Sequence, residues 1–208
     1  MSDNRPATRM SPAKRDSIFD AALQVFLRDG YTGASMDDIA ARSQVSKQTV
    51  YKHFGSKEAL FVEIVSSMTA KAGDGVHTEP QVSDADEATT YFSDYAMRQL
   101  TAVLTPTLVQ MRRLVIGEAG RFPDLARALY EQGPQRALAS MTAAFARLDA
   151  DGVLRVPDPA LAAEQFNWLV MSGPVNRAMF LGDSAIPPRR ELQRHADATA
   201  RLIVAAYR

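Results

Sequence analysis

The fold of this protein is decided by residues 35–54, which read SMDDIAARSQVSKQTVYKHF. Ser35 is a preferred helix N-cap residue, and the two aspartates after Met36 place negative charge in the positive first turn of a helix. Residues 43–46 are typical of a tight turn, and Ser46 then caps a second short helix. Two short helices joined by such a turn indicate a helix-turn-helix, whose second helix lies in the major groove of DNA.

The charge of this stretch favours the same interpretation. Between Ile39 and Lys57 there are four lysines or arginines, one histidine and no acidic residue. A run of this kind is more often a solvated face, but here it coincides with the second helix of the motif and the start of the next helix. The whole chain carries 24 basic and 24 acidic residues. This balance excludes a blanket polyanion binder and leaves room for a local basic face.

Helical periodicity extends over the rest of the chain, and no segment alternates in the way of a strand. We therefore expect an all-α protein of about nine or ten helices with no sheet. Start signals are Ser11-Pro12, Ser56, Ser83, Thr105-Pro106, Pro123 and Asp158-Pro159, and stop, kink or turn signals are Gly30, Gly55, Gly133-Pro134, Asp151-Gly152 and Gly182.

These signals predict three segments. Residues 1–10 are polar and are expected to form a disordered arm. Residues 11–56 would be a three-helix helix-turn-helix domain, and residues 57–208 a larger helical domain. Within the larger domain, residues 73–83 are expected to be a mobile loop, because they hold two glycines, a proline and few large apolar side chains.

Several classes of function are disfavoured. The chain has no cysteine, so disulfides, iron–sulfur clusters and thiol catalysis are excluded. Its longest charge-free stretch, residues 99–111, is too short for a membrane helix of about 20 residues, so we expect a cytoplasmic protein with no membrane partner. The three histidines are far apart in sequence and have no metal-ligand spacing, and no phosphate-binding loop is present. We expect no metal and no cofactor. An acid–base enzyme using Glu118 or Asp94 stays as an unfavoured alternative.

Three stretches in order, GYTGASMDDIA (residues 30–40), VSKQTVYKHF (45–54) and SKEALF (56–61), carry a resemblance. Together they resemble the N-terminal domain of tetracycline-repressor (TetR) family regulators, roughly from Lys14 to Phe61. The segment 112–173, with Gly117-Glu118, Arg121-Phe122-Pro123 and Leu125, resembles the ligand-binding half of the AcrR/AefR-like subgroup. The resemblance implies a dimeric DNA-binding repressor that a small molecule releases from a palindromic operator.

The resemblance also implies which side chains meet double-stranded DNA. Lys47 and Gln48 would read base edges, since lysine donates to guanine and glutamine pairs with adenine. Tyr51 could be half core, and His53 could be a surface residue without a role. The full predicted set is Ser35, Ser46, Lys47, Gln48, Thr49, Tyr51, Lys52, His53 and Lys57.

The larger domain would hold an effector and a homodimer interface. Its large and polar side chains suggest a ligand site made of Tyr95, Met111, Phe122, Tyr130, Asn167, Trp168, Met171, Asn176 and Arg177, although such residues are more often plain core. The apolar faces of the last two long helices suggest an interface made of Phe166, Leu169, Val170, Leu192, Thr199, Leu202, Ile203 and Ala206, which a monomer core could use equally. A ligand-binding protein with a vestigial DNA motif is the other alternative.

Overall fold

The computed structural model describes residues 10–208, and over that range it contains helices and no strand. The prediction of an all-α fold with nine or ten helices is confirmed. Of the predicted arm, residues 1–10, all but Met10 lie outside the described residues. The helices are α1 (Pro12–Gly33), α2 (Met36–Ser43), α3 (Lys47–Phe54), α4 (Lys57–Gly73), α5 (Ala85–Val103), α6 (Pro106–Glu118), α7 (Pro123–Tyr130), α8 (Arg136–Ala150), α9 (Pro159–Leu181) and α10 (Arg189–Tyr207).

The helix starts follow the capping signals closely. The hydroxyls of Ser35, Ser46 and Ser56 each accept a hydrogen bond from a backbone N–H in the first turn of α2, α3 and α4. Helix α5 begins one residue later than predicted. Asp84 rather than Ser83 caps it, because the Asp84 carboxylate accepts from the N–H groups of residues 86 and 87. Ser83 instead donates to the Glu87 carboxylate.

The predicted end of α1 at Gly30 is a kink in the structure. Gly30 has φ 73° and ψ 172°, a backbone conformation that L side chains rarely adopt, and helical structure resumes as far as Gly33. A tight turn after this kink brings Ala34 and Ser35 to the start of α2. The kink therefore sets the direction in which the helix-turn-helix leaves α1.

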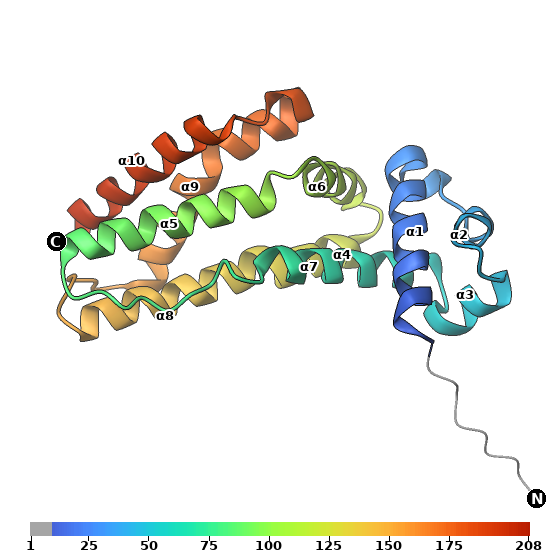
Figure 1. Cartoon of the computed structure of the whole chain (residues 1–208), viewed down its shortest axis with the longest axis horizontal. Helices are drawn as coiled ribbons and strands as arrows, with labels where there is room; N and C mark the ends of the chain where they lie inside the picture. The colour runs from blue at the N-terminus through green and yellow to red at the C-terminus, as the bar shows by residue number, and fades with distance from the viewer. Residues whose placement is uncertain (1–9) are drawn as a thin grey trace, which may run out of the picture.

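Helices α1–α3 form one end of the molecule, and α5, α8, α9 and α10 form the other (Figure 1). Helix α4 leads from the first group into the second and runs beside α7. In the larger group, α5 packs mainly on α10 and α8 packs mainly on α9. The C-terminus lies at the end of the molecule far from α1–α3.

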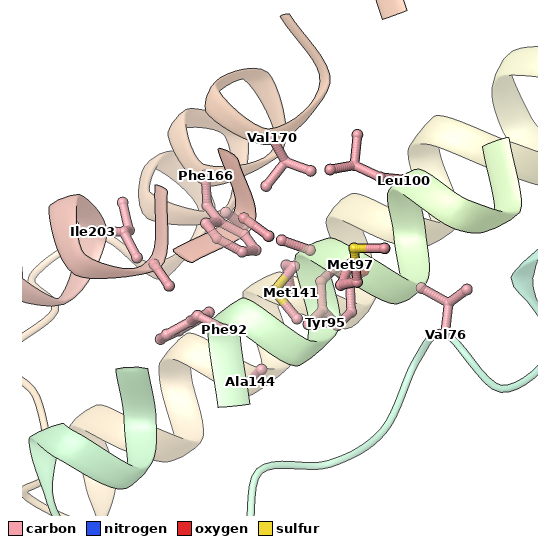
Figure 2. Packing of buried hydrophobic residues seen from close by; sticks show 14 of the residues in the cluster. Val76, Phe92, Tyr95, Met97, Leu100, Met141, Ala144, Phe166, Val170 and Ile203 are labelled. Carbon is pink, nitrogen blue, oxygen red and sulfur yellow. The ribbon is translucent and has the colours of Figure 1, made fainter. Parts of the chain in front are cut away.

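Two apolar clusters hold these groups together. The larger cluster lies between α5, α8, α9 and α10, and Figure 2 shows Phe92 and Tyr95 of α5 facing Phe166 of α9 within it. The smaller cluster contains Phe26 and Val50, and it continues through α4 into Val115 of α6 and Leu125 of α7. The predicted boundary at residue 56 thus crosses a continuous apolar core.

A segment without helix joins α4 to α5, where a mobile loop was predicted. Specific contacts fasten it to α5. His77 Nδ1 lies 3.0 Å from the Tyr95 hydroxyl, and the Tyr91 hydroxyl donates to the Thr78 carbonyl at 2.8 Å. Arg98 donates to the Val76 carbonyl and the Thr78 hydroxyl. These contacts place His77 beside the larger apolar core.

Candidate nucleic-acid interface and interior cavity

Helix α3 is held to the small core by one face and exposes the other. Val50 and Phe54 are buried, at 0% and 6% exposure. Lys47, Gln48 and Lys52 are exposed, and Tyr51 is 42% exposed. Because the two buried residues are four positions apart, they lie on one side of the helix and leave the side chains between them directed outward. The face that was predicted to read DNA is the free face of α3.

The turn before α3 fixes where that face points. Gln44 adopts a left-handed conformation with φ 56°, the only non-glycine residue with positive φ in the described part of the chain. Its N–H donates to the carbonyls of Ala40 and Ala41 and so caps the end of α2. Ser46 then caps α3, and its hydroxyl lies 2.8 Å from that of Thr49. Ser46 and Thr49 therefore stabilise the helix start while remaining at the exposed end of the motif.

Lys47 already has an acidic partner. Its Nζ lies 2.7 and 2.9 Å from the two carboxylate oxygens of Asp37, and 5.8 Å from the centre of the Tyr51 ring. The hydrogen bond to Asp37 raises the pKa of the Lys47 ammonium. Asp38, one residue on, pairs with Arg28 and Arg42. The two acids that precede the basic run thus neutralise part of it, which a count restricted to residues 39–57 overlooks.

Lys57 was predicted to contact phosphate, but its ammonium is engaged within the protein. Nζ donates to the carbonyls of Tyr31 (2.7 Å), Ala34 (3.0 Å) and Thr32 (3.3 Å). It also lies 4.8 Å from the Tyr31 ring centre. Burial lowers the pKa of Lys57, and Glu118 partly offsets this effect. The side chain therefore links the end of α1 to the start of α4.

Ser35 and His53 complete the predicted set. The Ser35 hydroxyl is exposed and accepts from Asp38 N–H at 3.1 Å, so it caps α2. His53 is half-buried near the end of α3. The predicted DNA-contacting residues therefore lie on α3, at the caps that precede α2 and α3, and at the first residue of α4, which is Lys57. Lys57 is the one whose charged group is turned inward.

A large cavity that is partly open to solvent lies in the larger domain. Its volume is about 660 Å³, within the range of about 300–1,000 Å³ usual for small-molecule sites. Side chains from α4 to α9 line it, most of them apolar. Six of the nine residues predicted for a ligand site are among these side chains: Met111, Tyr130, Asn167, Trp168, Met171 and Asn176.

The other three lie elsewhere for identifiable reasons. Tyr95 is fully buried in the larger core, where its hydroxyl meets His77. Phe122 packs on Tyr31, with ring centres 4.4 Å apart, and so joins the small core. Arg177 forms an ion pair with Glu191. Sequence reasoning missed several polar residues that line the cavity, among them Gln99, Arg112 and His77.

Most of the residues predicted for a dimer interface are covered by the chain itself. Phe166 and Val170 of α9 and Ile203 of α10 are at most 3% exposed, and Figure 2 shows them within the larger core. Leu192 and Thr199 are buried as well. The exposed members of the prediction are Leu169, Leu202 and Ala206.

The outer surface of α9 and α10 nevertheless carries large apolar side chains. Phe180 is 83% exposed, and both Trp168 and Leu202 are 62% exposed. Leu161 and Leu181, also on α9, are exposed too. We call these exposed residues of α9 and α10 the outer apolar face: Leu161, Trp168, Leu169, Phe180, Leu181 and Leu202.

Among the helices of residues 10–208, none is both long and apolar enough to cross a membrane. Within the same range, no three His, Cys, Asp or Glu side chains come together in a way that could hold a metal ion.

A helix-turn-helix at one end of an all-α body that contains a large, mostly apolar cavity defines the class of helix-turn-helix transcriptional regulators. Comparison with known families agrees with this geometry. Residues 18–64 match the tetR family of bacterial regulatory proteins, and residues 91–208 match the AefR-like transcriptional repressor C-terminal domain. The chain belongs to the TetR family of transcriptional regulators.

Individual relatives extend the match over the whole chain. A TetR-family transcriptional regulator structure from Mesorhizobium loti is 35% identical with a TM-score of 0.81, covering 95% of this chain and 99% of that one. The Flavonoid-responsive Regulator FrrA is 30% identical with a TM-score of 0.78, covering 95% and 98%. The HTH-type transcriptional repressor SCO4008 of Streptomyces coelicolor is 34% identical over 74 residues, 36% of this chain, and that alignment spans only 38% of the relative.

Proposed function

We propose that this protein is a dimeric, sequence-specific DNA-binding repressor that a small molecule releases from a palindromic operator. The observation that carries the proposal is the free face of α3, on which Lys47, Gln48 and Lys52 are exposed while Val50 and Phe54 anchor the helix. Lysine and glutamine are residue types that can discriminate guanine and adenine in the major groove. Thr49, Tyr51 and His53 would add contacts to the phosphate backbone.

The outer apolar face supports the dimer. Large exposed apolar side chains commonly mark an interface between proteins where they gather on one surface. A two-fold pairing through α9 and α10 would present two copies of α3 to one duplex. Half-sites about 34 Å apart would then match the two reading helices. Leu169, Leu202 and Ala206 remain candidates for this interface, together with Phe180 and Leu161.

Helix α4 supports coupling between the cavity and the DNA-reading end. Leu60 and Phe61 belong to the small core, whereas Met68 and Thr69, two turns further along, line the cavity. A molecule in the cavity would therefore push directly on a helix whose first turn is clasped to α1 by Lys57. The effector would favour an arrangement whose α3 spacing no longer fits the operator, to the extent that it binds that arrangement more tightly. FrrA is described as flavonoid-responsive, which supports a small-molecule effector here.

Footprinting on genomic DNA tests the proposal. The purified protein should protect a palindrome, and the Lys47→Ala, Gln48→Ala double variant should lose preference for it over scrambled DNA. Each well-made base contact contributes about 1–3 kcal/mol of discrimination, so a loss of at least about tenfold is expected. Lys71→Ala, on the exposed side of α4, is the matched control. Retention of full selectivity in the double variant would show that α3 is not the reading helix, and recovery of no palindrome would favour a protein that only binds ligand.

A further inference from the structure

Arg112 of α6 is a lining residue of the cavity whose charge has no partner. Over residues 10–208, the structure gives its guanidinium no hydrogen bond and no ion pair, and burial lowers its pKa with no nearby carboxylate to offset the effect. The next residue shows the contrast. Arg113 donates to the Ala178 carbonyl and pairs with Asp183. Arg112 is half-buried, and an arginine stays charged under all ordinary conditions, so its removal from water is costly unless an anion or water meets it.

The rest of the lining does not supply that anion. Within the described residues, the lining side chains include two arginines, Arg112 and Arg136, and one carboxylate, Glu164. Arg136 and Glu164 are both exposed, so Arg112 is the more buried of the three charges. The cavity therefore combines largely apolar walls with an excess of positive charge. Such a site disfavours a cationic ligand and leaves a neutral apolar ligand with a desolvated charge beside it.

A second polar group in the cavity also lacks a partner. Gln99 of α5 is 6% exposed, and its Nε2 donates to Asn167 Oδ1 at 3.0 Å. Its Oε1 is the one buried side-chain oxygen or nitrogen without a hydrogen-bond partner in the described structure. Buried polar groups are usually satisfied, so an orphan inside a cavity is suited to a hydrogen bond from a ligand.

From these features we propose that the effector is an amphipathic organic anion, whose acidic group pairs with Arg112 while its apolar body fills the cavity and a donor group on it reaches Gln99. The inference rests on the proposed function, because it names the chemical class of ligand for the same cavity. A carboxylate or sulfonate would take two parallel hydrogen bonds from the guanidinium. Planar aromatic acids and flexible alkyl acids share this chemistry.

Two fluorescent probes that differ by one charged group test the charge requirement. 1-Anilinonaphthalene-8-sulfonate is anionic, and N-phenyl-1-naphthylamine is its neutral parent. Trp168 is the single tryptophan and lines the cavity, so energy transfer from it reports probe bound in its neighbourhood, and the part of that signal that depends on Arg112 comes from the cavity. Arg112→Met should weaken the sulfonate at least about tenfold, since a desolvated charge pair contributes at least that much, and should leave the parent unchanged or tighter. Arg155→Met, an exposed arginine outside the cavity, should change neither probe.

Competition in the wild-type protein distinguishes the two kinds of acid and needs no variant. 2-Naphthoate and dodecanoate should each be compared with its neutral methyl ester for displacement of the sulfonate probe. Stronger displacement by either acid than by its ester supports the proposal, and the better acid identifies the aromatic or the alkyl class. Equal displacement by acids and esters would overturn it. If Arg112→Met does not fold, Arg112→Gln should give the same selective loss, and an equal loss of both probes would also count against the proposal.

DNA binding separates this inference from the proposed function. If acids bind through Arg112 and release the operator, both stand. If acids bind through Arg112 but operator affinity is unchanged, the ligand class stands and the ligand-release part of the proposed function fails. If only neutral molecules release the operator, the proposed function stands and the anionic class fails.

Discussion

Lys47 pairs with Asp37, and this ion pair would compete with the base contact proposed for the lysine. To donate to a base, its ammonium would have to leave the carboxylate that lies 2.7 Å away, or share itself between the two. Phosphates would meet the same acid as a repulsive neighbour at the edge of the proposed reading face. Asp37 would therefore oppose binding to any DNA, and only a sequence that offers Lys47 a good acceptor would compensate for the loss.

Replacing this acid should loosen the selectivity of the protein. Asp37→Asn is expected to tighten binding to scrambled DNA by about two- to fivefold, the range that exposed ion pairs usually span, and to tighten operator binding less. Fluorescence anisotropy at fixed salt with operator and scrambled duplexes would measure both affinities. Asp86→Asn, at the exposed start of α5, changes the net charge equally and is the control. An equal gain in Asp86→Asn would mean that overall charge, rather than the pair with Lys47, is responsible.

At the scale of elements, α4 passes very close to the junction of α7 and α8. Among the glycines of the described residues, Gly133 at this junction has the least room for a side chain. Residues 131–135 form a π-helical turn containing Gly133 and Pro134, where a break or kink was predicted. A methyl group on Gly133 would lie 2.9 Å from Thr69 Cγ2 of α4. Thr69 cannot easily rotate away, because its hydroxyl donates to the Val65 carbonyl at 2.7 Å. This glycine allows α4 to pass close to the π-helical turn along the cavity wall.

Whether a substitution at Gly133 stabilises or destabilises the protein should depend on Thr69. Gly133→Ala is expected to lower the free energy of unfolding by about 1 kcal/mol, because overpacking outweighs the helical preference for alanine. In a Thr69→Ser background the obstructing methyl is gone, so the same change should be neutral or stabilising by up to about 1 kcal/mol. Chemical denaturation of the four proteins in this double-mutant cycle gives the coupling. Additive effects would contradict the close approach of α4.

At the scale of the whole molecule, the outer apolar face holds six of the nine large hydrophobic side chains that are exposed in the described part of the chain. Trp168 and Phe180 belong both to this face and to the cavity lining. A partner seated on α9 and α10 would therefore cover one wall of the ligand site as well as the apolar surface. Oligomerisation and ligand binding would then stabilise each other by mass action.

A charge placed on this face should dissociate the assembly. Leu202→Glu is expected to convert a dimer to a monomer, because two copies related by a two-fold axis would each bury an unpaired carboxylate. Light scattering after gel filtration measures the mass directly. Ala146→Glu, on the exposed side of α8, introduces the same charge away from the face and should leave the mass unchanged. A Leu202→Glu protein that remained dimeric would place the interface elsewhere.

The sequence predicts features that depend on neighbouring residues in the chain, and it fails for features that depend on residues far away in the chain. Helix starts depend on local capping, so Ser46 and Thr105 were identified correctly from single residues. Which side of a helix faces inward depends on its neighbours. Phe166 and Trp168 are two positions apart on α9, an apolar helix, and only packing on α8 shows that the first is core and the second exposed. Nothing local distinguishes the unpaired Arg112 from the paired Arg113, because the carboxylate that decides it comes from residue 183.

The shared small core has a consequence for building hybrid regulators from this chain. Phe26 and Tyr31 pack on Phe61 of α4, and Tyr31 also packs on Phe122 beyond α6. A chimera spliced at residue 56 would set these rings against foreign partners and should fold poorly. The exposed side chains of α3 make no contribution to that core. They can therefore be exchanged between regulators without moving a whole domain. Retargeting the protein to a new promoter is therefore best attempted by exchanging residues such as Lys47 and Gln48 in place.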